Sequence, residues 1–346
     1  MRVICDAREY AALQPAAPHV QGASEPLVVR IAQSLAAAGH RVDGIWTGDE
    51  ELYVDGVMWW PWNRHPETCD VLISCEGLFY AHELTFDRFI VPLNKINPIL
   101  SGYEEKVDAF VVFSEEHKRQ LLFYNNTIKP EQVVIVPPGV EIAPEYEVPK
   151  RRYSMLWCHA PERGLVHIAR QWPEIIRQVP EAELFITYGL EKHWQTNRWA
   201  MDNMAEELAE CRRWVKAYPR SVHDIGRLKP HSKILTLQGE CELLSYPADA
   251  PLPGIVTSLA VMEAAAAGEA LLLSRLEGLP EVFGECAEFL DIPINEQVWA
   301  DKTVELLRDK KRLGAMGAKA REWAKGYPWS AHAEAWLRLV EAKAPA

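Results

Sequence analysis

Short apolar runs separated by polar segments recur along the first part of the chain. Each run has four to six residues rich in Val, Ile, Leu and Phe, which is typical of buried strands. A helix is predicted after the first run, because Leu27, Ile31 and Leu35 recur at helical spacing between Ser24 and Gly39. Strands that alternate with helices indicate an α/β fold with a parallel, doubly wound sheet. The strands predicted here are residues 2–5, 41–46, 70–74, 89–93, 108–113 and 132–136.

The same alternation resumes after a proline-rich stretch. Residues 137–152, PPGVEIAPEYEVPKRR, hold four prolines and several charges and are predicted to be a linker. The chain is therefore expected to form two Rossmann-like domains, residues 1–142 and 150–325. Beyond the linker the predicted strands are 153–158, 183–189 and 242–247, and the predicted helices are 165–179, 232–240, 257–267, 299–324 and 329–343.

The composition favours a soluble, globular and cytoplasmic protein. The 346 residues are 48% hydrophobic and 25% charged, and the seven cysteines form no CxxC pair. No run approaches the roughly 18 apolar residues of a membrane span, and the N-terminus lacks the regions of a signal peptide. The formal net charge is −12, and residues 1–145 hold 11 Lys or Arg against 21 Asp or Glu. Binding to a nucleic acid or an anionic membrane is therefore not favoured.

Two common nucleotide-binding designs are missing from the sequence. No Asp-x-Asp motif occurs, so a bound metal that holds a diphosphate is disfavoured. No G-x-G-x-x-G fingerprint follows the first predicted strand, which disfavours a nicotinamide enzyme.

Several segments resemble, in order, the motifs of one enzyme family. They are FSEEHKRQL with VVIVPPGVE, APERGL, VPEAELFITYG, HDIGRL, and LLSYPADAPLPGIVTSLAVMEAAAAGEALLLSRLEGLPEV. Their order resembles the family 4 (group 1) glycosyltransferases over most of residues 108–325, and more weakly over the first 45. The resemblance implies the GT-B fold, two Rossmann-like domains facing a central cleft, with a C-terminal helix at about 328–345 that packs back on the first domain. It also implies a retaining, metal-independent enzyme without a cofactor, which moves a hexose from a nucleotide-diphosphate sugar to an acceptor hydroxyl.

The donor of such a reaction presents a ribose diol and a diphosphate. A carboxylate can accept two hydrogen bonds from the diol, and Glu263 matches the second Glu of the family's E-x7-E motif. Its helix is predicted to begin near Thr257-Ser258. A diphosphate is stabilised by a helix N-terminus and a cation, and Arg163 precedes Gly164 at a strand-to-helix turn. We therefore expect Glu263 to hold the ribose and Arg163 to stabilise the leaving diphosphate, the alternatives being a solvated glutamate and a surface arginine.

Four further donor-site residues follow from the resemblance. Gly22 corresponds to a loop near the donor phosphate and Arg227 to a position near the base and diphosphate. Gly278 and Leu279 correspond to a turn whose amides lie near the phosphates. Simple turn glycines and a surface charge are the alternative interpretations.

On the acceptor side, Asn94 and Lys95 follow a predicted strand after which many relatives carry a His. Lys95 would act electrostatically on developing charge, and a polar loop pair is the alternative. His82 and His117 are the last candidates for the missing His, and both are expected to be ordinary surface histidines. The cluster Trp59-Trp60-Pro61-Trp62 either lines an acceptor site or belongs to the core or an interface.

The sequence departs from the family pattern at three positions of the donor site. Ile255 stands where the first Glu of E-x7-E reaches the transferred sugar, Trp157 stands near the place of a second basic residue, and Ala23 replaces a second Gly. These changes support an alternative hypothesis, that the protein is a degenerate relative that binds a nucleotide or nucleotide-sugar without transferring the sugar. A transferase acting on modified nucleic-acid bases is a third hypothesis, which the charge disfavours.

Overall fold

The chain divides into two compact units. The computed structural model describes residues 1–8, 13, 15, 25–75, 81–93, 104–190, 203–226, 228, 231–248 and 258–342. Unit 1 comprises Met1–Gly139 with Tyr327–Ala346, and unit 2 comprises Val140–Leu252 with Ser258–Gly326. The first boundary falls inside the proline-rich stretch, and the last falls just before the predicted C-terminal helix.

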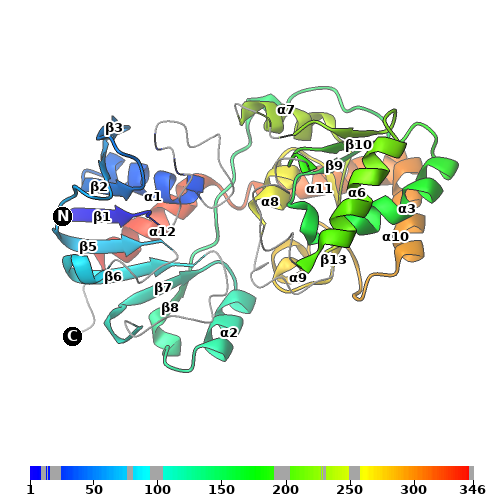
Figure 1. Cartoon of the computed structure of the whole chain (residues 1–346). Helices are drawn as coiled ribbons and strands as arrows, with labels where there is room; N and C mark the ends of the chain where they lie inside the picture. Colours follow the sequence, from blue (N-terminus) through cyan, green and yellow to red (C-terminus); the bar gives the residue numbers. More distant parts are fainter. Residues whose placement is uncertain are drawn as a thin grey trace. The chain divides into compact units, whose positions relative to one another are not determined.

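Unit 1 is built on an eight-stranded sheet (Figure 1). Its order is β3-β4-β2-β1-β5-β6-β7-β8, and every pair is parallel except β3 with β4. The six predicted strands are confirmed, but the β3–β4 hairpin was missed, because β3 has only three residues and β4 was read as part of a tryptophan cluster. The strands are β1 Arg2–Asp6, β2 Arg41–Trp46, β3 Leu52–Val54, β4 Val57–Pro61, β5 Thr68–Ser74, β6 Thr85–Pro92, β7 Ala109–Val112 and β8 Val133–Ile135.

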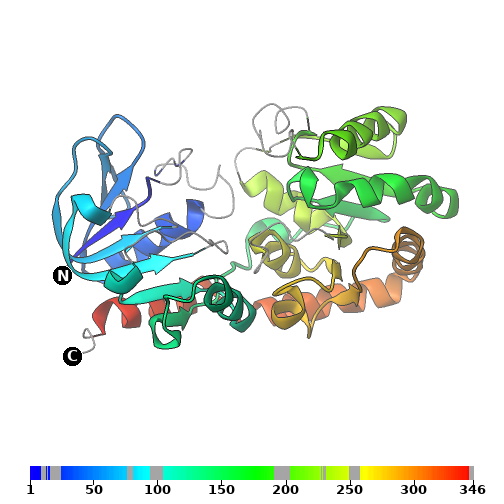
Figure 2. The same ribbon diagram turned by 60° about the horizontal axis from the view of Figure 1, so that its bottom comes forward.

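Helices cover both faces of this sheet. On one face, α1 (Glu25–Ala37) packs against α12 (Trp329–Glu341), so the C-terminal helix returns to unit 1 (Figures 1 and 2). Successive strand residues point to opposite faces, so Val3 packs in the core beneath α1 while Ile4 packs in the core that includes Leu121 of α2 (Glu115–Tyr124). Short 3-10 helices lie at Ala81–Glu83, Glu104–Lys106 and Pro130–Gln132.

The tryptophan cluster is divided between the core and the surface. Trp59 is fully buried, Trp60 is half-buried and donates from Nε1 to Asp43 Oδ1 at 2.8 Å, and Trp62 is exposed. Of the two histidines, His82 is exposed as expected, but the expectation for His117 was wrong. His117 is fully buried, and its Nδ1 accepts the backbone N–H of Phe113 at 3.2 Å, which satisfies that nitrogen inside the core.

Unit 2 is built on a six-stranded, all-parallel sheet of order β11-β10-β9-β12-β13-β14. Helix α3 packs against α6 and α10, and α11 packs against α8 and β13 (Figure 1). The helix predicted over 299–324 is two helices, because the Asp309 side chain accepts the backbone N–H of Arg312 and caps a new one. The elements are β9 Ser154–Trp157, α3 Leu165–Gln178, β10 Glu183–Ile186, α6 Ala205–Ala217, β11 Val222–Asp224, α7 Ser232–Glu240, β12 Leu243–Tyr246, α8 Leu259–Ala266, β13 Ala270–Ser274, α9 Leu279–Phe283, β14 Glu288–Leu290, α10 Glu296–Arg308 and α11 Lys310–Ala324, with 3-10 helices at Pro144–Tyr146 and Pro161–Arg163.

The predicted linker is partly folded onto unit 2. Tyr146 is buried, and the 3-10 helix that it ends packs against α7. The Lys150 ammonium donates to the carbonyls of Cys241 at 2.7 Å, Ala267 at 3.0 Å and Gln238 at 3.3 Å. These carbonyls lie at the C-terminal ends of α7 and α8, so one side chain joins the ends of both helices.

Glu269, between α8 and β13, is a fully buried carboxyl group. Neither of its oxygens has a hydrogen-bond partner in the described part of the chain. Burial raises its pKa well above the ordinary value, and the opposing charge of Lys150 does not offset this.

This burial predicts a pH-dependent stability. The folded-state pKa of Glu269 is raised, so the folded protein favours the protonated carboxyl group. The resulting contribution to the free energy of unfolding is fully present below the unfolded-state pKa and is lost as the pH rises through the folded-state pKa. We expect Glu269→Gln to match the wild type near pH 5 and to become the more stable protein towards pH 9, measured by urea unfolding. The exposed Glu181→Gln serves as the control. A difference between Glu269→Gln and wild type that stays constant with pH would contradict the assignment.

Candidate functional site

The topological switch point of unit 2 lies between β9 and β12. The chain leaves β9 towards β10 and β11 on one side, and returns to β12, β13 and β14 on the other. Ligands of open parallel sheets bind at the carboxyl ends of the strands that flank such a point. The segments that follow β9 and β12 are therefore the first place to look for a site.

The turn after β9 brings Arg163 to the end of β12. Gly164 makes this close approach with a φ of +106°, and a Cβ there would lie 2.1 Å from the Pro247 carbonyl oxygen. Only glycine fits both the backbone angle and the space. Arg163 is half-buried and lies close enough to the phenol of Tyr246, the last residue of β12, to lower its pKa. The predicted phosphate cation thus lies at the switch point.

A histidine that sequence reasoning missed lies in the same turn. The ring of His159 stacks on that of Tyr246, with centroids 3.8 Å apart and planes at 11°. Its Nε2 lies 3.1 Å from Ser258 Oγ, and its backbone carbonyl accepts a 2.7 Å bond from Trp157 Nε1. Trp157 itself is fully buried, so a core indole fills the position where relatives carry a second basic residue.

Burial sets the protonation of this cluster. It raises the pKa of Tyr246 to about 12, although Arg163 nearby lowers it. It lowers the pKa of His159 to about 3, and the charge of Arg163 acts in the same direction. At neutral pH Arg163 is therefore the cation, while the phenol and the imidazole are neutral.

Helix α8 begins where the sequence predicted and carries Glu263. The Ser258 side chain accepts the backbone N–H of Val261, which makes Ser258 the N-cap. Glu263 is half-buried, with 27% of its side chain exposed, and its Oε1 lies 3.0 Å from Nε2 of His231. His231, directly before α7, was also missed, because nothing in the sequence pairs it with a residue 32 positions later.

The turn before α9 lies close to the same cluster. Glu277 adopts a positive φ of 46° and lies near enough to Tyr246 to raise its pKa further. The Leu279 side chain is fully buried, and its N–H already donates to the Leu276 carbonyl at 3.1 Å. The Leu279 amide, which was predicted to lie near the donor phosphates, is therefore hydrogen-bonded within its own turn. The role of Gly278 stays a prediction.

The switch point of unit 1, between β1 and β5, carries an ionic cluster. Arg8 is buried and donates to both oxygens of Asp6, from Nε at 2.9 Å and from Nη2 at 2.8 Å. It also donates to Glu83, and this bond lowers the pKa of Glu83. No sequence motif in CDARE predicts that Arg8 binds two carboxylates. Only the fold places Arg8 beside Glu83.

Six positions named from the sequence lie outside the described residues. They are the predicted site residues Gly22, Asn94, Lys95 and Arg227 and the two departures Ala23 and Ile255. The roles of the four site residues stay predictions.

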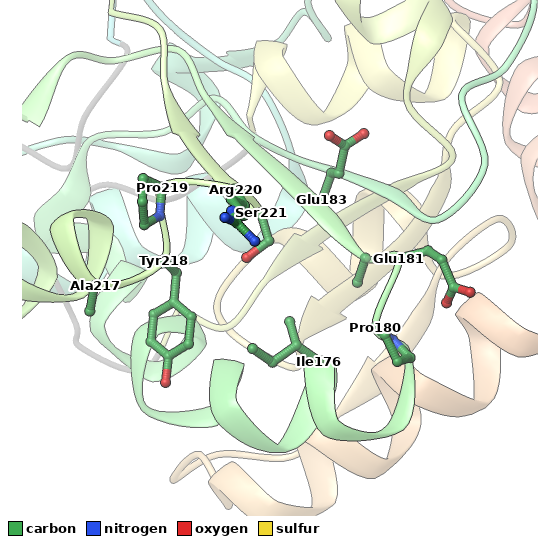
Figure 3. A pocket seen from close by; sticks show the side chains of 10 residues that line it. Ile176, Pro180, Glu181, Glu183, Ala217, Tyr218, Pro219, Arg220 and Ser221 are labelled. Carbon is green, nitrogen blue, oxygen red and sulfur yellow. The ribbon is translucent and has the colours of Figure 1, made fainter.

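A pocket of about 530 Å³ lies at the opposite edge of the unit 2 sheet (Figure 3). Ile176 of α3 and the segments 180–183 and 217–221 line it, directly before β10 and β11. It therefore lies at the amino ends of these strands, away from Arg163 and Glu263, and is not the predicted donor site.

None of the helices in the described part of the chain is long and apolar enough to cross a membrane. None of the described His, Cys, Asp and Glu side chains gather in a group of three or more with the geometry of a metal site.

Comparison with known proteins supports the two-domain architecture. No protein-family model matches the chain. A D-inositol 3-phosphate glycosyltransferase of Kineococcus radiotolerans is 25% identical over 256 residues, which cover 68% of this chain and 57% of that protein. Among solved structures, a sucrose-phosphate synthase from Thermosynechococcus elongatus matches with a TM-score of 0.73 at 15% identity, over 98% of both chains. HepE from Anabaena, solved with UDP and glucose, matches with a TM-score of 0.70 at 10% identity, over 98% of this chain and 99% of its own.

The fold is GT-B. The solved structures match essentially the whole chain, with parallel sheets in two domains, as the sequence predicted. At these identities they show the fold, and the activity of the chain has to be argued from its own residues.

Proposed function

We propose that this protein is a retaining, metal-independent glycosyltransferase of family 4, which moves a hexose from a nucleotide-diphosphate sugar to an acceptor hydroxyl. The observation that carries the proposal is the arrangement at the switch point of unit 2. There an arginine follows β9 and a half-buried glutamate lies on α8, near the ends of adjacent strands. The fold and the name of the Kineococcus relative support the reaction class.

Each group has one task in the proposed reaction. Glu263 accepts hydrogen bonds from the ribose hydroxyls, with His231 holding one of its oxygens. Arg163 stabilises the negative charge that develops on the leaving diphosphate. The bond from the anomeric carbon to the phosphate oxygen breaks, the bond to the acceptor oxygen forms on the same face, and the acceptor proton passes to the departing phosphate oxygen.

The proposal is tested by incubating the protein with UDP-, GDP- and dTDP-sugars in the presence of EDTA. We expect slow release of a nucleoside diphosphate from one of them, and transfer with the anomeric configuration kept once an acceptor is supplied. Binding without hydrolysis or transfer would favour the degenerate protein, and the absence of any binding would overturn the donor site. Loss of activity in EDTA would contradict metal independence alone.

Glu263→Lys should abolish the thermal shift that the donor induces. The substitution removes both acceptors for the ribose diol and places a cation beside His231. The matched control is Glu181→Lys, which makes the same charge reversal at the pocket on the opposite sheet edge. A donor-induced shift that survives in Glu263→Lys contradicts the ribose assignment, and one lost in Glu181→Lys moves the binding site to the pocket.

A further inference from the structure

We infer that His159 is a positioning residue, which sets the first turn of α8 and so the place of Glu263, and which joins that helix to Arg163. The inference deepens the proposed function and rests on it for the identity of the ligand. The contacts of the histidine itself do not depend on that function.

The contacts of His159 run in two directions. On one side its ring is stacked on Tyr246, and the phenol of Tyr246 lies close enough to Arg163 for the guanidinium to lower its pKa. On the other side its Nε2 lies 3.1 Å from Ser258 Oγ, the N-cap of α8. The imidazole therefore lies between Arg163, expected to bind the diphosphate, and the start of the helix that carries Glu263, expected to bind the ribose.

The bond to Ser258 fixes the orientation of the cap. Ser258 Oγ accepts the Val261 N–H and also hydrogen-bonds His159 Nε2, as donor or as acceptor according to the tautomer of the neutral ring. A hydroxyl held in this way keeps a lone pair directed at the Val261 N–H. Because α8 has only eight residues, losing this cap should destabilise a large part of the helix.

Packing alone does not account for a histidine at this position. His159 is buried, with 7% of its surface exposed, and its Nδ1 has no hydrogen-bond partner in the described part of the chain. A buried polar atom without a partner is unfavourable, so a phenyl ring would suit the stack on Tyr246 better. A phenyl ring, however, cannot form the hydrogen bond to Ser258 Oγ.

This reasoning separates stability from binding. We expect His159→Phe to melt no lower than the wild type, because it keeps the stack and removes Nδ1, a buried atom that no described residue hydrogen-bonds. We expect the same variant to bind the donor about five- to tenfold more weakly, since a loosened cap lets the turn that precedes Glu263 fray. The loss should appear mainly in KM, with kcat changed less than about twofold.

Matched variants identify the bond responsible. His159→Gln can place its amide near the position of Nε2 and should recover most of the affinity. Ser258→Ala should weaken binding as His159→Phe does, and the double variant should be no worse than the single ones. The control is His223→Phe, which removes another stacked and hydrogen-bonded histidine of unit 2, one that contacts Phe185 and Glu183.

A second measurement needs no ligand. Hydrogen exchange of the α8 segment, residues 259–266, is followed by mass spectrometry in the unliganded protein. We expect exchange about tenfold faster in His159→Phe and Ser258→Ala, and near the wild-type rate in His159→Gln and His223→Phe. If the wild type binds no nucleotide-sugar, the proposed function fails, while this exchange result still decides the inference. Unchanged α8 exchange in His159→Phe, or equal loss of Tm and affinity in the Phe and Gln variants, overturns it.

Discussion

Gly317→Ala should lower the free energy of unfolding of unit 2 by about 2–3 kcal/mol. Gly317 lies on α11 against the turn that ends α8, and a Cβ there would lie 2.2 Å from the Gly268 carbonyl oxygen. Gly268 cannot easily yield, because it holds a φ of +72° between α8 and β13. By helix propensity alone, the same change would stabilise α11 by about 1 kcal/mol, so propensity and packing predict opposite signs.

The control for this prediction lies one turn away on the same helix. At Gly314 a Cβ would meet no atom within 4 Å, so Gly314→Ala should raise the free energy of unfolding by about 0.5–1 kcal/mol. Urea unfolding followed by tryptophan fluorescence measures both variants. Equal effects of the two substitutions would show that α11 does not pack closely on the end of α8.

Arg163→Ala should lower kcat/KM for sugar transfer by about 100- to 1,000-fold, roughly 2.7–4 kcal/mol. In the proposed reaction Arg163 is the cation that offsets the charge of the leaving diphosphate, and the neutral His159 beside it cannot take over this task. Arg163→Lys should recover part of the loss, since an ammonium keeps the charge but not the planar fork of donors.

The matched control is Arg220→Ala, which removes an exposed arginine at the pocket on the opposite sheet edge. It should leave kcat/KM within about twofold of the wild type. Steady-state kinetics with the donor identified by the panel measures both variants. A kcat/KM for Arg163→Ala within about threefold of the wild type would mean that the leaving group is stabilised elsewhere.

Only some features of the candidate site could be predicted from the sequence. The start of α8 and the place of Glu263 on it could be predicted, because a cap and an alanine run lie within a dozen residues, whereas the role of Glu263 stays a prediction. Glu263 and its partner His231 could not be paired from sequence, because Glu263 lies on α8 and His231 lies directly before α7, 32 residues away along the chain. Likewise, nothing in CHAPERG indicates that its histidine lies beside the cap of a helix 99 positions later.

The sequence by itself determined the alternation of strands and helices, since buried parallel strands require continuous apolar runs and their crossovers require helices. It also determined the two-domain GT-B fold through motifs that recur in order. Only the tertiary structure decided which polar side chains meet. The switch point between β9 and β12 brings Arg163, Tyr246 and His159 together, because the strand order, which no local pattern encodes, makes neighbours of strands far apart in the chain.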